Sequence, residues 1–161
     1  MEIRPGEESD LEALNDLYNG YVRTSPATFD IDEVSMEARK AWFDALGGPH
    51  RLFVGLDDDR FLGYAYSGSI SPRRAYDTSV STSVYLDPNV FRMGIGTALY
   101  EVLFDALTDE DVHRAYAGIT VPNPASFALH ERFGFRQVGY YTEQGRKFDK
   151  YWDVAWFEKA L

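Results

Sequence analysis

The feature that most constrains the fold is a strand, loop and helix pattern at residues 83–100, SVYLDPNVFRMGIGTALY. β-branched and aromatic residues are followed by a Pro-Asn turn, two spaced glycines and an apolar pattern of helical period. Because Gly94 and Gly96 lack a Cβ, the backbone there can approach a ligand closely. Successive N–H groups at the start of the helix can then surround an anion such as a pyrophosphate. The pattern therefore predicts a strand, an anion-binding loop and a helix.

A second loop-to-helix unit follows at residues 121–135, VPNPASFALHERFGF. Together the two units resemble the GNAT acyl-CoA N-acetyltransferases, and the resemblance extends over nearly the whole chain. Further motifs narrow it to the phosphinothricin and methionine sulfoximine acetyltransferase branch. These motifs are residues 18–19, 24–29, 63–66, 73–76, 123–130 and 145–148.

The resemblance implies that acetyl-CoA is the co-substrate. In the family the first loop binds the CoA pyrophosphate, which assigns that role to Arg92, Met93, Gly94, Ile95, Gly96 and Thr97. Phe91 departs from the Gln or Arg that the family usually has three residues before the first glycine. Since the loop acts mainly through backbone amides, we expect phosphate binding to survive this change.

The pantetheine arm of CoA is rich in amides and can pair with a free strand edge as another strand would. We expect that edge at Val84, Tyr85 and Leu86. The family resemblance also implies that Asn123 and Ser126, at the start of the second helix, contact the arm. Asn123 lies between two prolines, and a turn-forming role fits it nearly as well.

The family position that binds the substrate carboxylate is Arg73, and a guanidinium fork suits a planar carboxylate. Phe29 and Tyr76 are expected to wall the acceptor pocket, although both would also serve as core anchors. Arg74 is interpreted as a solvated loop charge. Ser71 stands where relatives commonly place a second basic residue, so the polar head of the acceptor stays open.

Two catalytic positions follow from the resemblance. His130, seven residues after Asn123, would supply a proton to the departing thiolate, and a histidine on the helix surface is the competing interpretation. Ser81 stands where relatives place a glutamate as general base. A hydroxyl can orient a water but does not take the proton itself at neutral pH. Asp77 is a weak replacement candidate, and Trp152 replaces a histidine expected near the C-terminus.

Composition limits the remaining possibilities. At 161 residues, with 45% hydrophobic side chains, the chain fits one domain, residues 1–161. No segment is apolar enough for a membrane span or a secretory signal, so we expect a cytoplasmic protein. There are no cysteines and three histidines, none at a ligand spacing that suggests a metal site.

The net charge of −10 argues against nucleic-acid binding, which needs a basic surface. Four lysines against fifteen aspartates resemble the balance of proteins adapted to high salt. An ordinarily acidic cytosolic enzyme is an equally good interpretation.

The predicted elements alternate as in α/β proteins. A short strand at 2–4 precedes a helix opened by a capping box at Ser9 and Glu12, and Ser35 starts a second helix. Further strands are predicted at 51–56, 61–67, 78–86, 115–120, 135–142 and 151–157, with helices after the glycine loop and at 125–133. This is the order of a single-domain GNAT fold of the α/β (α+β) class, with a mixed central sheet of about seven strands flanked by about four helices.

These observations predict an enzyme that moves an acetyl group directly from acetyl-CoA to the primary amine of a small amino acid-like molecule. The absence of cysteine fits direct transfer without a covalent enzyme intermediate. Two alternatives stay open: a non-catalytic acyl-CoA-binding module, because Ser81 and Trp152 depart from the family, and a protein N-terminal acetyltransferase. The branch also suggests a homodimer.

Overall fold

The computed structural model describes residues 1–90 and 94–161, and its strands form one seven-stranded sheet in the order β1-β2-β3-β4-β5-β7-β6. The strands are β1 (Glu2–Pro5), β2 (Leu52–Asp57), β3 (Arg60–Ser69), β4 (Ser79–Leu86), β5 (Arg114–Thr120), β6 (Arg136–Lys147) and β7 (Lys150–Ala160). The helices are α1 (Leu11–Thr24), α2 (Met36–Asp44), α3 (Ile95–Leu107) and α4 (Pro124–Arg132), with short 3₁₀ turns η1 (Glu8–Asp10) and η2 (Arg74–Tyr76). The predicted order of elements is confirmed.

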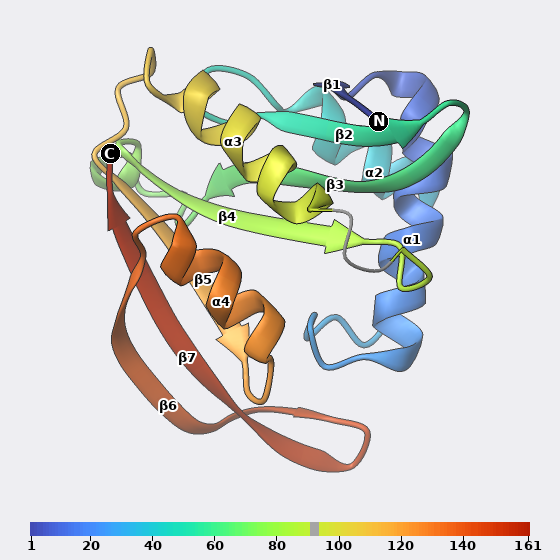
Figure 1. The fold of residues 1–161 in the computed structure, drawn as a ribbon. Coiled ribbons are helices and arrows are strands. Elements are labelled where there is room, and N and C mark those ends of the chain that lie inside the picture. Colours follow the sequence, from blue (N-terminus) through green and yellow to red (C-terminus); the bar gives the residue numbers. More distant parts are fainter. Residues whose placement is uncertain (91–93) are drawn as a thin grey trace.

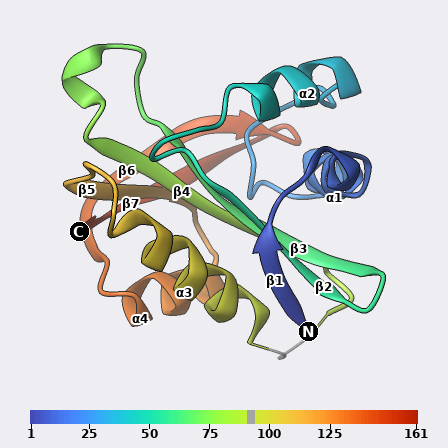
Figure 2. The same cartoon turned by 90° about the horizontal axis from the view of Figure 1, so that it is seen from above.

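The helices cover the two faces of the sheet in pairs. Helices α1 and α2 lie on one face, and α3 and α4 lie on the other (Figure 1, Figure 2). Each face has its own apolar cluster: Leu99, Leu103 and Phe157 belong to the α3 side, and Leu14 and Tyr64 to the α1 side. The part of the sheet between the two helix pairs is therefore buried on both faces, whereas β6 at its edge is largely exposed.

The start of α1 differs from the predicted capping box. Ser9 lies within η1, and the side chain that accepts a backbone N–H is that of Asp10, 2.8 Å from the nitrogen of Glu7. Asp10 also accepts two hydrogen bonds of 2.8 Å from the guanidinium of Arg4 on β1. The Asp10 carboxylate therefore joins β1 to the short turn that precedes α1.

Strands β4 and β5 provide the main irregularity of the sheet. They run parallel and pair at Ser79, Val80 and Ser81 with residues 114–116. Beyond Ser81, β4 continues to pair with β3 on its other edge, up to Leu86. Strand β5 continues to pair with β7, up to Thr120. The two strands thus separate in the middle of the sheet while each keeps one partner (Figure 1).

The β6–β7 hairpin is longer than predicted and reaches back to the N-terminal part of the chain. Its turn holds Phe148 and Asp149 at φ values of 55° and 54°, without a glycine. Lys147, 3% exposed, donates hydrogen bonds of 2.8 Å to the carbonyls of Ser25 and Thr28. The loop between α1 and α2 is therefore fixed to the last hairpin of the sheet.

Gly63 offers a test of the β3–β4 contact. It has φ +150°, and a Cβ there would lie 2.4 Å from the carbonyl oxygen of Tyr85 on β4. We expect Gly63→Ala to lower the free energy of unfolding by about 2 kcal/mol or more, measured by urea denaturation. Gly96→Ala is the control: its Cβ would meet Leu86 and Leu129 at an ordinary 3.5 Å, and the helical position favours Ala by up to about 1 kcal/mol. Equal losses in both variants would contradict this account.

Candidate active site

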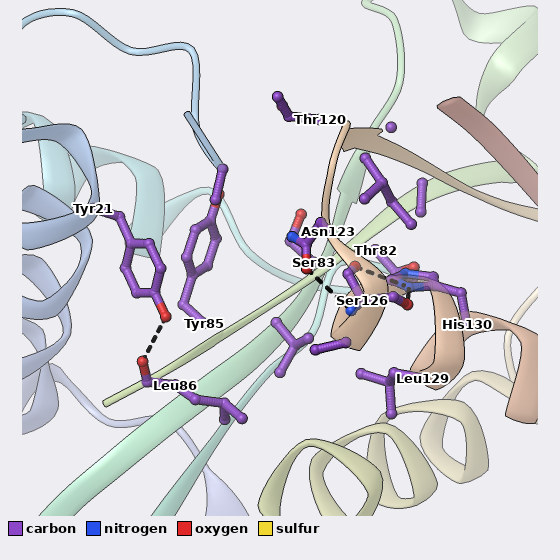
Figure 3. A pocket seen from close by; sticks show the side chains of 16 residues that line it. Tyr21, Thr82, Ser83, Tyr85, Leu86, Thr120, Asn123, Ser126, Leu129 and His130 are labelled. Atoms are coloured by element: carbon purple, nitrogen blue, oxygen red, sulfur yellow. Dashed lines mark hydrogen bonds between the residues drawn. The ribbon is translucent and has the colours of Figure 1, made fainter. Parts of the chain in front are cut away.

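A cavity of about 250 Å³ opens where β4 and β5 separate (Figure 3). Its walls come from these two strands, the start of α4 and Tyr21 of α1. Six residues predicted to contact the cofactor or to act in catalysis line it: Val84, Tyr85, Leu86, Asn123, Ser126 and His130. The cavity lies between strands rather than on a surface, so a linear ligand can enter the sheet there.

Among residues 1–90 and 94–161, no strand pairs with the cavity-facing edge of β4 beyond Ser81. Backbone groups along residues 82–86 can therefore pair with the amides of an extended ligand. The carbonyl of Leu86 accepts a 2.7 Å hydrogen bond from the hydroxyl of Tyr21 (Figure 3). This bond ties α1 to the end of the open edge. Tyr21 carries no local sequence signal, because its role depends on the tertiary position of α1.

The start of α3 has the backbone geometry that the predicted anion-binding turn requires. Gly94 is the N-cap residue in the left-handed region, with φ +69°. Its carbonyl accepts the first helical bond from Ala98, so the N–H groups of Ile95, Gly96 and Thr97 have no partner within the helix. These groups and the helix dipole favour a phosphate. Arg92 and Met93 were predicted to share this role, and they lie outside the described residues.

The backbone conformation favours glycine at position 94, where φ is +69°, but not at position 96. A side chain at Gly94 would be held in a conformation that L-residues rarely adopt. A Cβ at Gly96 would instead make ordinary contacts with Leu86 and Leu129. The neighbouring helix and strand leave room for a methyl group at Gly96, and the close approach of a ligand to both glycines stays a prediction.

Asn123 combines the two interpretations that the sequence leaves open. Its Oδ1 accepts a 3.1 Å hydrogen bond from the backbone N–H of Ser126, so it is the N-cap of α4. The same side chain lines the cavity (Figure 3). With the oxygen used in the cap, the amide nitrogen remains the group that can donate to a ligand. Helix capping thus orients this side chain for binding.

His130 is 3% exposed and bonded at both ring nitrogens. Nδ1 lies 2.7 Å from the carbonyl oxygen of Ser126, which can only accept, so Nδ1 carries the proton. Nε2 then accepts from the hydroxyl of Tyr100 at 3.0 Å, and this hydroxyl lies 3.5 Å from Thr82 Oγ1. Burial lowers the pKa of His130, and the bond to Ser126 opposes this shift in part. A neutral imidazole results.

The family resemblance implies a protonated or a water-linked His130 as the proton donor, and this geometry disfavours the protonated form. A protonated imidazole ready to donate to a thiolate would need a raised pKa or a free N–H, and the structure favours neither. Thr82, whose Oγ1 lies 3.5 Å from the Tyr100 hydroxyl, also lines the cavity, and sequence reasoning missed it. A proton-donating role for His130 remains a prediction, now by way of Tyr100 and Thr82.

The remaining predicted site residues lie outside the cavity wall. Ser81 Oγ is 3.3 Å from the carbonyl oxygen of Gly68. Arg73 is the N-cap residue of η2, in the loop between β3 and β4, and Tyr76 at the other end of η2 is 43% exposed. Figure 2 shows this loop rising from the sheet on the side of α2, away from α3. The structure thus separates the predicted acceptor residues from the cofactor cavity.

Phe29 lies on the loop that Lys147 holds. Its ring covers Gly145 of β6, where a Cβ would come within 2.3 Å of the ring. Asp77 precedes β4 and lies 4.0 Å from Arg74, so it does not share a strand face with Ser81 as a regular strand would require. The Trp152 indole donates a 2.9 Å bond to the carbonyl of Lys147 and so supports the same hairpin.

The fold and the cavity can now be compared with those of known protein families. A family model described as "Acetyltransferase (GNAT) domain" matches residues 3–156. The chain belongs to the GNAT acetyltransferase family. It is therefore an acetyl-CoA-dependent N-acetyltransferase, and no helix in the described ranges is long and apolar enough to cross a membrane.

Three similar proteins give this family membership more detail. A phosphinothricin N-acetyltransferase of Streptomyces coelicolor is 53% identical over 100% of this chain and 96% of its own length. A phosphinothricin acetyltransferase of Sinorhizobium meliloti, solved in complex with acetyl-CoA, has a TM-score of 0.94 at 29% identity, covering 99% of this chain and 88% of that one. A ribosomal-protein-alanine N-acetyltransferase of Brucella melitensis has a TM-score of 0.93 at 31% identity, covering 100% of both chains.

The turn at Gly94 predicts a specific binding defect. Ala in the left-handed region costs about 1–2 kcal/mol, and a loop that relaxes to escape this strain must be rebuilt when CoA binds. We expect Gly94→Ala to raise the Kd for acetyl-CoA roughly 5- to 30-fold in calorimetry. Gly48→Ala is the matched control, since Gly48 has φ +55° and, as at Gly94, no described atom lies within 4 Å of the added Cβ. Unchanged affinity in Gly94→Ala would show that the turn has no part in binding.

The buried His130 predicts a pH dependence of stability. Its folded pKa is below the ordinary 6.5, so the unfolded chain takes up a proton that the folded chain excludes. Stability from this source is complete above pH 6.5 and falls as the pH drops from there toward the folded pKa. We expect the Tm to fall less between pH 7 and pH 5 in His130→Gln than in the wild type. The control is the exposed His113→Gln, and an equal slope in His130→Gln and the wild type would refute the assignment.

Proposed function

We propose that this protein acetylates the α-amine of a small amino acid-like acceptor of the phosphinothricin or methionine sulfoximine type. The observation that carries the proposal is the Streptomyces coelicolor relative, which is similar along the whole chain and is named for phosphinothricin. Arg73 supports a carboxylate-bearing acceptor, because its side chain makes no hydrogen bond or ion pair within residues 1–90 and 94–161. An exposed, unengaged guanidinium is available for a carboxylate.

The proposed reaction is a direct transfer. The neutral amine attacks the thioester carbon, and the carbonyl oxygen takes the negative charge of the tetrahedral intermediate. A backbone N–H on the free edge of β4, within residues 82–86, is positioned to stabilise that oxygen. Collapse breaks the carbon–sulfur bond and releases CoA thiolate, while the nitrogen loses one proton. The proton that the nitrogen releases is returned to the thiolate through water, or through Thr82, whose hydroxyl then gives up one proton and takes up another.

Water is the proposed acceptor of the amine proton. Ser81 replaces the family glutamate, and its hydroxyl faces the carbonyl of Gly68, so it can hold a water without taking the proton. An amine of pKa near 8 is about one-tenth neutral at pH 7, which costs roughly 1.4 kcal/mol and leaves turnover possible. The rate should therefore depend on the fraction of neutral acceptor.

A protein N-terminal amine is the second candidate acceptor. The Brucella melitensis structure favours it, since that protein is named for alanine of a ribosomal protein. The two acceptor classes differ at Arg73, because a peptide N-terminus carries no neighbouring carboxylate.

We also propose that two copies associate through this hairpin. Its exposed side includes five large apolar or aromatic residues, between 45% and 56% exposed: Val138, Tyr140, Tyr141, Phe148 and Tyr151. Apolar side chains gathered on one hairpin are typical of an interaction surface. A homodimer formed there would bring the partner close to the loop that carries Phe29.

The acceptor proposal is tested by release of CoA thiol with a panel of amines. We expect phosphinothricin and methionine sulfone to be acetylated faster than polyamines and tripeptides. Arg73→Ala should lower kcat/KM roughly ten- to hundredfold for these amino acids, and should leave acceptors without a carboxylate nearly unchanged. Arg74→Ala, at a side chain 97% exposed, is the matched control.

Two results would reject the proposal. Faster turnover of the tripeptides would favour a protein acceptor. An equal loss on both kinds of acceptor in Arg73→Ala would assign Arg73 to folding. Repeating the panel at low and molar salt tests whether the acidic composition reflects a high-salt cytoplasm.

A further inference from the structure

A second cavity, of about 240 Å³, lies between α1, α2 and β3. It is on the face of the sheet opposite α3 and α4 (Figure 2). Neither the cofactor turn nor the predicted acceptor residue Arg73 contributes to it. The side chains used below all line it: Tyr18, Asp30, Arg39, Trp42, Tyr64 and Tyr66.

Arg39 is the unusual member of this group, because its charge is buried without a counter-ion. Its side chain is 7% exposed, and its Nε donates a 3.0 Å hydrogen bond to Asn15 Oδ1. The guanidinium carbon lies 4.7 Å from the ring centre of Tyr18 and 5.0 Å from that of Trp42. No carboxylate of the described chain lies within the 4.0 Å of an ion pair, and the terminal nitrogens make no hydrogen bond to it.

Tyr64 adds a second unpaired donor to the same cavity. Its side chain is 0% exposed, and its hydroxyl is without a hydrogen-bond partner among the described residues. The ring is held by stacking against Tyr66 and Tyr85, with centroid distances of 6.2 and 5.4 Å. A buried hydroxyl that donates to nothing costs about 1–3 kcal/mol. Its position beside a buried cation makes an acceptor of negative charge the complementary ligand.

We propose that this cavity binds a small oxyanion, a carboxylate or a phosphinate, through the Arg39 fork and the Tyr64 hydroxyl. Two oxygens of such a group match the parallel N–H donors of a guanidinium, and the hydroxyl can bond one of them. The aromatic rings of Tyr18 and Trp42 keep the guanidinium in one plane before the ligand arrives.

Asp30 limits which ligands the site accepts. Its Oδ2 accepts a 2.6 Å hydrogen bond from the hydroxyl of Tyr18, and both residues line the cavity. A carboxylate on this wall opposes a second negative charge, so a singly charged oxyanion suits the cavity better than a doubly charged one. The oxyanion has two possible sources. One source is the acidic head group on the side chain of the acceptor, and this alternative rests on the proposed function. The other source is a separate small molecule.

The competing explanation is purely structural. In that account Arg39 joins α2 to α1 through Asn15 and the two rings, and Asp30 is its counter-ion through water. The two accounts make opposite predictions for Asp30→Asn. Removing the repelling carboxylate tightens binding of an anion, whereas removing a counter-ion lowers stability and leaves anion affinity unaffected.

The decisive measurement is calorimetric titration with dimethylphosphinate at constant ionic strength. The protein is first saturated with CoA, so that the turn at Gly94 is filled. We expect saturable binding to the wild type, binding weakened at least tenfold in Arg39→Lys and several-fold in Tyr64→Phe, and tighter binding in Asp30→Asn. Arg132→Gln, which removes an exposed cation from α4, is the control and should bind as the wild type does.

The Tyr64→Phe variant separates a loss of binding from a loss of folding. Since it removes an unpartnered buried hydroxyl and keeps the ring, its Tm should equal or exceed that of the wild type. Absence of saturable binding to the wild type overturns the proposal, as does equal affinity in the wild type, Tyr64→Phe and Arg39→Lys. Neither result depends on turnover. Both can therefore be told apart from a result that rejects the proposed acetylation of amino acid-like acceptors.

Kinetics then identify the source of the oxyanion. If the oxyanion is the head group of the acceptor, dimethylphosphinate competes with phosphinothricin. In that case Tyr64→Phe raises the KM for phosphinothricin more than the KM for methionine sulfone, whose head group is uncharged. If it belongs to a separate molecule, dimethylphosphinate is not competitive, and Tyr64→Phe changes both KM values equally or not at all.

Discussion

The site depends on the point at which β4 and β5 stop pairing. Three residue pairs join these strands, and each strand then follows its other neighbour, β3 or β7. Backbone N–H and C=O groups need partners, so an open edge inside a sheet is stable only where water or a ligand reaches it. The anion-binding turn of α3 and the cap of α4 both lie beside this opening. A single interruption of the sheet thus creates a place for an extended, amide-containing cofactor.

The net charge of the protein repels anionic ligands at long range, whereas local donor groups attract them at short range. With a net charge of −10, the chain repels both CoA and acidic acceptors. The groups that attract anions are therefore local: unpaired N–H groups at the start of α3, and guanidinium groups freed from carboxylate partners. Arg39 is freed by burial between rings, and Arg73 by exposure on a loop.

The order of helices and strands could be predicted from the sequence, and so could the parts of the site that are formed by consecutive residues. The glycine turn, the open strand and the cap at Asn123 follow from local backbone chemistry, and the structure brings them to one cavity or beside it. Thr82, Tyr100 and Tyr21 were not predicted, because their roles arise from contacts between distant segments. His130 was placed in the cavity wall correctly, but its neutral state depends on burial and on Ser126, which no spacing reveals. The hairpin turn at Phe148 was missed because it adopts a left-handed conformation without glycine or asparagine.

Strand β7 lies between β5 and β6, although it follows both in the chain. During translation it leaves the ribosome after every other strand. Until then, β5 is attached to the growing sheet by its three pairs with β4, and its long edge is unpaired. Lys147, just before β7, closes the loop near Phe29 at the same late stage. The second edge of β5 is therefore paired only after β7 has formed, so the strand that forms one wall of the cavity depends on the last strand of the chain for its final position.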